Sequence, residues 1–192
     1  MLALNQPRIP IAWSPRNNAE LRFAIKECIE VSTDCLKGPR GPIGSWDIYD
    51  VTDMRHLFVD SKTLKTDDPK PLPGADKFNG DVSKWDVLNV MNMQSMFEYA
   101  ASFDADLSKW DVSSVTKMGA MFAKATSFDA DLSKWDVSSV TNMDSMFWKA
   151  ASFNADLSKW QVSSVTNMHG VFGHTASFNA DLSKWAWRWR WL

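Results

Sequence analysis

Residues 102–126 read SFDADLSKWDVSSVTKMGAMFAKAT, and residues 127–151 continue directly with SFDADLSKWDVSSVTNMDSMFWKAA. The two segments agree at most positions, so the chain repeats with a period of 25 residues. Such a period is typical of proteins whose repeats pack on one another, because a single repeat cannot bury its own apolar face. The period aligns one Phe and one Trp in each repeat: Phe78, Phe103, Phe128, Phe153 and Phe178, with Trp85, Trp110, Trp135, Trp160 and Trp185.

The apolar pattern inside each repeat predicts two elements. Across residues 114–122 the apolar side chains recur at helical spacing, after a serine that can cap a helix. Across residues 107–112 apolar and charged side chains alternate, which favours a strand with one buried face. We therefore expect an α/β repeat fold: a right-handed, leucine-rich-repeat-like solenoid with one parallel strand and one short helix per repeat.

The repeat also carries a family resemblance. The pattern F-[ND]-x-D-[LV]-S-x-W-D-V-S-x-V-T-x-M recurs in register from about Trp46 to Trp185. It resembles the BspA-like, Mycoplasma-type branch of the leucine-rich repeats, which occurs in bacterial and algal surface proteins. The resemblance implies a surface or interaction protein, and it carries over no catalytic residues.

Segments of different sequence flank the repeats. We expect residues 1–45 to form an amino-terminal cap, because residues 18–31 combine an Asn cap with apolar residues on one helical face. The repeats occupy residues 46–185, and 14 extra residues within 59–77, rich in Pro and Asp, indicate an insertion loop. Residues 186–192 replace the next repeat with a Trp/Arg-rich tail.

The chain has two cysteines, Cys28 and Cys35. They lie seven residues apart, near the end of the expected helix and in the loop after it, so a disulfide can join them. Two free thiols in a reducing compartment are the other interpretation. A disulfide, together with the family resemblance, favours the cell surface or a secreted, oxidising compartment, while the chain shows neither a signal peptide nor a transmembrane segment.

The tail alternates Trp187, Trp189 and Trp191 with Arg188 and Arg190. Alternation is typical of a strand, which here would seal the last repeat. Trp and Arg also dominate interface hot spots and suit membrane headgroups, so an adhesive tip is a second hypothesis. A truncated end without a selected role is a third.

Two columns of charge are expected on the surface of the repeats. Lysines recur at positions 84, 109, 134, 159 and 184, and aspartates at 86, 111 and 136 lie beside them, interrupted by Gln161. One interpretation is a solvated face on which the columns neutralise each other. The other is a partner-binding face, as extended repeat surfaces often provide. The candidate interface residues are Lys109, Asp111, Lys134, Asp136 and Lys159, with Trp148, which replaces a small residue, and the five Trp and Arg residues of the tail.

A further polar column has Asn or Asp in each of five successive repeats, and two interpretations apply to it. Asx oxygens could bind Ca²⁺ between repeats, but the glycine-rich motif of calcium-binding repeats is missing. Side-chain bonds to the backbone of neighbouring repeats are the favoured interpretation. The column consists of Asn79, Asp104, Asp129, Asn154 and Asn179.

The remaining features narrow the class of function. A formal net charge of -2 gives no global attraction to nucleic acid. The sequence contains no phosphate-binding, dinucleotide-binding, nucleophile or zinc-protease motif, so we expect no enzyme, cofactor or metal. The expected function is protein–protein or cell-surface interaction. The alternative is a structural subunit that docks through its ends and tail onto a larger assembly, and any membrane contact is expected only through the tail or a partner.

Overall fold

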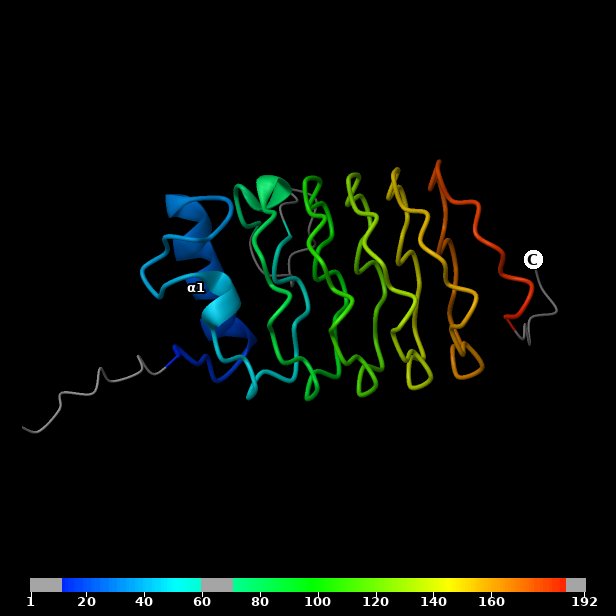
Figure 1. The fold of residues 1–192 in the computed structure, drawn as a ribbon, viewed down its shortest axis with the longest axis horizontal. Helices are drawn as coiled ribbons and strands as arrows, with labels where there is room; N and C mark the ends of the chain where they lie inside the picture. Colours follow the sequence, from blue (N-terminus) through cyan, green and yellow to red (C-terminus); the bar gives the residue numbers. More distant parts are fainter. Residues whose placement is uncertain (1–11, 60–70, 186–192) are drawn as a thin grey trace, which may run out of the picture.

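The structure is a computed structural model and describes residues 12–59 and 71–185. Successive repeats lie side by side along one axis, each as a narrow loop of chain, and a helix lies across the first of them (Figure 1). We call each repeat a row and the whole array the stack. The buried residues of all rows form one continuous apolar core along the stack.

Helix α1 spans Asn18–Val31, the range that the apolar pattern predicted. The side chain of Asn17 caps it by accepting a hydrogen bond from the N–H of Glu20. Its inward face buries Leu21, Ala24, Ile25, Cys28 and Ile29. Two short 3₁₀ turns, Ile43–Ser45 and Ala75–Lys77, are the other helical elements of the described residues. No helix in that part of the chain has the length and apolar character that a membrane crossing requires.

The predicted leucine-rich-repeat-like solenoid of parallel strands and short helices is wrong. Among residues 12–59 and 71–185 the repeats contain no helix and no strand longer than an isolated bridge. Four parallel bridges, one from each row to the next, are the whole of the regular β-structure there. They join Asp53 to Asn92, Asn92 to Lys117, Lys117 to Asn142, and Asn142 to Asn167.

Residues 107–112 form turns where a strand was expected. The N–H of Trp110 donates to the carbonyl of Leu107 at 3.1 Å, and the N–H of Val115 to that of Val112 at 2.9 Å. Each bond closes a turn within the row, so these groups are not available to a neighbouring strand. Apolar and charged side chains still alternate between buried and exposed positions, since Trp110 is buried and Lys109 is exposed. Alternating burial therefore did not require an extended strand.

Where a helix was expected across residues 114–122, alternate N–H groups from Met118 to Lys124 donate to the next row. The N–H of Ala120 donates to the carbonyl of Asp144 at 2.7 Å, and that of Phe122 to Met146 at 2.9 Å. A helix would need the same N–H groups to bond four residues back in their own row. Ala120 also has a left-handed backbone, φ 53°, which breaks a right-handed helix. The apolar spacing is satisfied by tight turns instead.

Aromatic columns fill the core between rows. Successive Trp rings lie nearly parallel, with centroids 6.2–6.5 Å apart from Trp85 to Trp185. From Trp110 on, each indole N–H also donates to a buried carbonyl of the preceding row, for example from Trp110 to Val82 at 3.0 Å, and that of Trp85 donates to Ile43 in the cap. The carbonyl of Val82 also accepts the N–H of Trp85 at 3.1 Å, so the indole gives this buried carbonyl a second donor. A Trp at this position therefore packs and bonds at once, which Phe or Leu cannot do.

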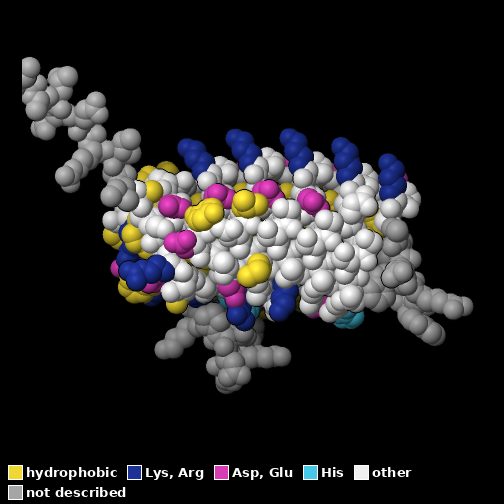
Figure 2. Space-filling model, turned by 90° about the horizontal axis from the view of Figure 1, so that it is seen from below, with side chains coloured by type: hydrophobic (Ala, Val, Ile, Leu, Met, Phe, Trp, Pro, Cys, Tyr) yellow, Lys and Arg dark blue, Asp and Glu magenta, His cyan; other side chains and the backbone are white. Residues whose placement is uncertain are grey.

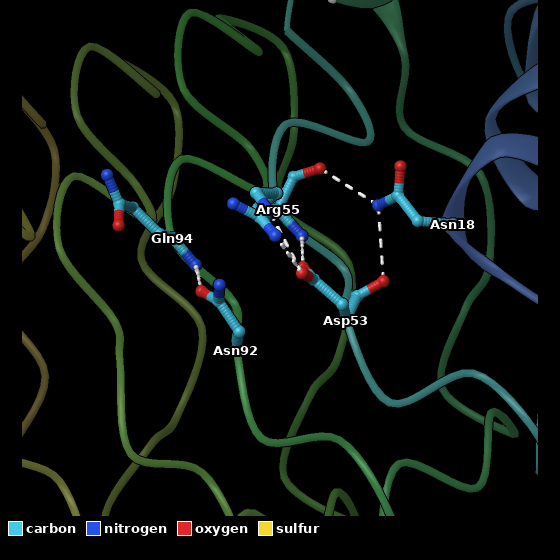
Figure 3. A network of polar contacts seen from close by, with 5 residues as sticks. All are labelled: Asn18, Asp53, Arg55, Asn92 and Gln94. Atoms are coloured by element: carbon cyan, nitrogen blue, oxygen red, sulfur yellow. Dashed lines mark hydrogen bonds and ion pairs between the residues drawn. The ribbon is translucent and has the colours of Figure 1, made fainter. Parts of the chain in front are cut away.

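Helix α1 terminates the stack by hydrogen bonding as well as by burial. In the second row, the carbonyls of Asn92 and Gln94 accept N–H groups from the first row. The equivalent carbonyls of the first row have no preceding row, and Asn18 of α1 donates to both of them, at 3.2 Å to Asp53 and 3.0 Å to Arg55 (Figure 3). Arg22, one helical turn later, donates to the carbonyls of His56 and Leu57.

The structure joins Cys28 and Cys35 as a disulfide, with 5.2 Å between their Cα atoms. Both residues are fully buried. The bond connects the last turn of α1 to the loop that leads into the first row, so it fixes the capping helix on the end of the stack.

Replacing Trp110 by Phe should lower the free energy of unfolding by roughly 1–3 kcal/mol, because the buried ring becomes smaller and the carbonyl of Val82 loses one of its two donors, the other being the N–H of Trp85. Trp148→Phe is the matched control, because Trp148 is only half-buried and its indole N–H has no partner in the described part of the chain. That control should cost less than about 1 kcal/mol. Chemical denaturation of both variants measures the difference, and equal losses would contradict the bonding role.

Candidate functional site

The predicted lysine column lies on the outside of the stack. All five of its lysines are exposed. Figure 2 shows Lys and Arg side chains projecting in a regular line along one edge of the stack, with a line of acidic side chains beside them. This column runs along the stack, with one lysine from each of five successive rows, and we call it the lysine row. It consists of Lys84, Lys109, Lys134, Lys159 and Lys184.

A shallow groove lies beside the middle of the lysine row. It has a volume of about 460 Å³ and runs between the third and fourth rows. Four of the residues predicted for partner binding line it together, Lys109 and Asp111 from one row and Lys134 and Asp136 from the next, with Trp110, Val112 and Ser113 between them. A second groove, of about 390 Å³, lies beside Lys184.

The aspartates beside the lysine row are held by their own backbone turns. Asp111 accepts hydrogen bonds from the N–H and hydroxyl of Ser113, at 3.0 and 2.6 Å. Asp106, which precedes Lys109, accepts from the N–H of Ser108 at 2.8 Å. Asx turns of this kind fix the loop and consume the carboxylate oxygens that face the backbone.

The same hydrogen bonds lower the pKa of these carboxyls. For Asp106 the hydrogen bonds from Ser108 lower the pKa below its ordinary value of 3.8, and the nearby Lys109 and Lys134 lower it further. For Asp111 the bonds from Ser113 also lower the pKa, against an opposing effect of Asp136. The pKa is lowered, with serine hydrogen bonds as the main cause, for Asp81, Asp106, Asp111, Asp131, Asp136, Asp156 and Asp181.

The lysines have no comparable structural partner. In the part of the chain that the structure describes, ion pairs join other residues, such as Lys26 with Glu30 and Arg55 with Asp53, and none includes a lysine of this row. The two charged columns therefore differ: the aspartates stabilise turns, and the ammonium groups are left to solvent and to any anionic partner.

The Asn/Asp column bonds to the backbone of neighbouring rows, which confirms the favoured interpretation. The side chain of Asn79 accepts from the N–H of Asp104 at 2.9 Å, and Asp104 accepts in turn from Asp129 at 2.9 Å. The pattern continues through Asn154 to Asn179. Within the described residues, no group of three or more His, Cys, Asp or Glu side chains is placed to hold a metal ion.

Trp148 fills a gap in the surface instead of projecting from it. It is half-buried, and a Cβ added to Gly173 of the next row would lie 2.7 Å from its ring. Two lysines cover the ring, with the Nζ of Lys149 at 4.3 Å and that of Lys124 at 5.0 Å from its centroid. Lys124 also lies 3.8 Å from the ring centroid of Tyr99. The sequence had not indicated this cation–π cluster.

Two further results concern the candidate residues. Trp187, Arg188, Trp189, Arg190 and Trp191 lie outside the described residues. The sequence reasoning also missed three exposed apolar side chains in the first two rows, Tyr49, Leu88 and Met91. The signal was present, because these residues stand where later rows have Ser or Thr, as at Ser113 and Thr116.

Comparison with protein-family models and curated sequences gives a family but no curated relative. A family model described as a Mycoplasma protein of unknown function, DUF285, matches residues 28–70 and 71–186. These matches cover most of the chain, including the first row, the insertion and the later rows. No curated protein matches the sequence.

The lowered pKa values predict how stability depends on pH. A carboxyl whose pKa is lower in the folded chain stabilises it above the unfolded value of 3.8, and this contribution is lost as the pH falls through the folded value. The free energy of unfolding should therefore fall between about pH 4 and pH 2. Asp106→Asn/Asp131→Asn/Asp156→Asn should make that fall shallower in acid titrations of stability. The exposed Asp50→Asn is the control, and an unchanged slope in the triple variant would contradict the assignment.

Proposed function

The chain belongs to the DUF285 family, and on that premise we propose that it is a non-enzymatic module that binds other proteins through the lysine row. The family description states no function, so the proposal is supported by the surface itself. The site is a regular column of cations beside a shallow groove, carried on a stack whose rows are fixed to one another by hydrogen bonds.

The observation that carries the proposal is the unequal use of the two charged columns. The turns of each row need the aspartates, because Ser108 and Ser113 bond to Asp106 and Asp111. No bond in the described part of the chain needs the Nζ atoms of Lys109 or Lys134. A lysine that recurs in successive rows from Lys84 to Lys184, with no hydrogen bond or ion pair in the described residues, is best suited to an acidic partner that spans several rows, such as an extended acidic segment of another protein.

The finer sequence resemblance supports the same proposal. The repeat pattern around Trp110 and Trp135 is similar to that of BspA-like proteins, which are interaction proteins of cell surfaces. The resemblance is one of repeat sequence, and it supports the binding role only. The disulfide between Cys28 and Cys35 agrees with a surface or secreted location.

A second candidate function is a structural subunit docked through the end of the stack. The last row leaves Phe172, Phe178 and Leu182 only partly buried. Their equivalents one row earlier, Phe147, Phe153 and Leu157, are fully buried. Partly exposed apolar side chains at the end of the stack favour contact with another surface.

Binding of a fluorescent deca-glutamate peptide tests the lysine row. The intact chain should bind the peptide with an affinity that falls as salt is added. Lys109→Glu/Lys134→Glu should weaken binding at least tenfold, because it reverses two adjacent cations beside the groove.

The matched control is Lys37→Glu/Lys117→Glu, which makes the same change in net charge at two exposed lysines outside the row. This control should retain most of the affinity, and both variants should keep the wild-type unfolding midpoint. Equal weakening by the two variants would mean that only net charge matters, and undiminished binding by Lys109→Glu/Lys134→Glu would reject the site.

A further inference from the structure

The first two rows carry an apolar patch that the packing of the stack does not explain. Tyr49, Leu88 and Met91 are 52%, 42% and 54% exposed. Single exposed apolar residues are normal on a protein surface, but these three lie close together in adjacent rows. Asn89, between Leu88 and Met91, donates to the carbonyl of Tyr49 at 3.1 Å, which holds the two rows in contact at this point.

The equivalent positions of later rows show that the patch is not required for folding. The position of Tyr49 and Leu88 is occupied by Ser113 and Ser138 in the third and fourth rows. The position of Met91 is occupied by Thr116, whose hydroxyl bonds to the preceding row at 3.1 Å. Rows with Ser and Thr at these positions have the same turns and the same buried core. The apolar residues of the first two rows therefore serve something other than the stack.

Carboxylates border the patch directly. Asp47 accepts a hydrogen bond from the N–H of Tyr49, and Asp86 from the N–H of Leu88, both at 3.2 Å. Asp50 is exposed immediately after Tyr49. Figure 2 shows exposed hydrophobic side chains next to acidic ones toward the end of the stack that carries α1. A suitable partner must supply apolar surface and positive charge together.

The chain itself contains such a segment. Residues 186–192, AWRWRWL, alternate aromatic side chains with two arginines. We propose that this Trp/Arg segment of one copy binds the patch of Tyr49, Leu88 and Met91 on a second copy. Trp and Arg are the residues most enriched in interface hot spots, and Arg pairs well with both carboxylates and aromatic rings.

Distance favours a second copy over the same chain. The tail follows Trp185, and four steps of 6.2–6.5 Å between Trp rings separate that row from the row of Leu88. Seven residues reach roughly 25 Å only when fully extended. To reach the patch of its own chain, the segment would have to be fully extended over its whole length, and no residues would remain to cover the patch. Docking between copies is head-to-tail, so each copy offers one tail and one patch and the assembly can grow.

Sedimentation velocity of three full-length forms tests the proposal. The patch variant is Leu88→Ser/Met91→Thr, which gives the second row the residues of the third. The tail variant is Trp187→Ala/Trp189→Ala/Trp191→Ala. The wild-type chain should self-associate increasingly with concentration, and each variant alone should stay monomeric with an unchanged unfolding midpoint.

Mixing the two variants is the decisive arm. The patch variant still has its tail and the tail variant still has its patch, so an equimolar mixture should form a dimer that grows no further. Leu36→Ser, which removes an exposed apolar side chain elsewhere, should self-associate like the wild type. A monomeric wild-type chain, association that survives in either variant, or a mixture that stays monomeric would overturn the proposal. The lysine row is intact in all these forms, so the outcome is independent of the proposed function.

Discussion

The backbone hydrogen bonds that residues 118–124 and their equivalents make between rows run in one direction, and the register of the stack depends on this constraint. Other N–H groups, such as that of Thr116, donate to the preceding row. In the third row, the N–H groups of Met118, Ala120, Phe122 and Lys124 all donate to the following row, at 2.7–2.9 Å. The same four positions repeat the pattern in the second and fourth rows. Because donors and acceptors recur every 25 residues, a slip of one residue would break the whole set. The register of the bonds also stacks the Phe and Trp rings.

This directional set of bonds leaves chemically different groups at its two ends. The first row presents carbonyls, and Asn18 and Arg22 of α1 supply the donors that these carbonyls need. The last row presents N–H groups at Gly170, Phe172 and His174, for which residues 12–59 and 71–185 hold no acceptor. The helix is therefore a cap specific for one end. Burial of the Arg22 side chain lowers its pKa, because removal from water disfavours the charged guanidinium.

Sequence reasoning succeeded where a side chain alone decides the outcome. Leu21 and Ile25 follow helical spacing on α1 and are buried, and the Asx column bonds to neighbouring rows as expected. It failed where the backbone decides. Met118, Met121 and Phe122 have helical spacing, but left-handed residues such as Ala120 turn the chain without a helix. An alanine side chain does not indicate a positive φ. At Ala120 this backbone conformation depends on packing against the neighbouring rows, which the local sequence does not show.

The charged surface was predictable only in part. Lys109 and Asp111 alternate with buried residues, which correctly placed both on the outside. Their unequal roles depend on turn geometry, since Asp111 bonds to Ser113 whereas Lys109 has no bond in the described residues. The apolar patch was missed because attention went to what the repeats share. The informative residues were those that differ, namely Tyr49, Leu88 and Met91.

The direction of the bonds that residues 118–124 make to the next row can be measured by scalar couplings across hydrogen bonds in NMR spectra. We expect couplings from the amide nitrogens of Met118, Ala120 and Phe122 to the carbonyl carbons of Asn142, Asp144 and Met146. Couplings from those nitrogens to carbonyls four residues earlier in their own row would show a helix in each repeat and would contradict the account.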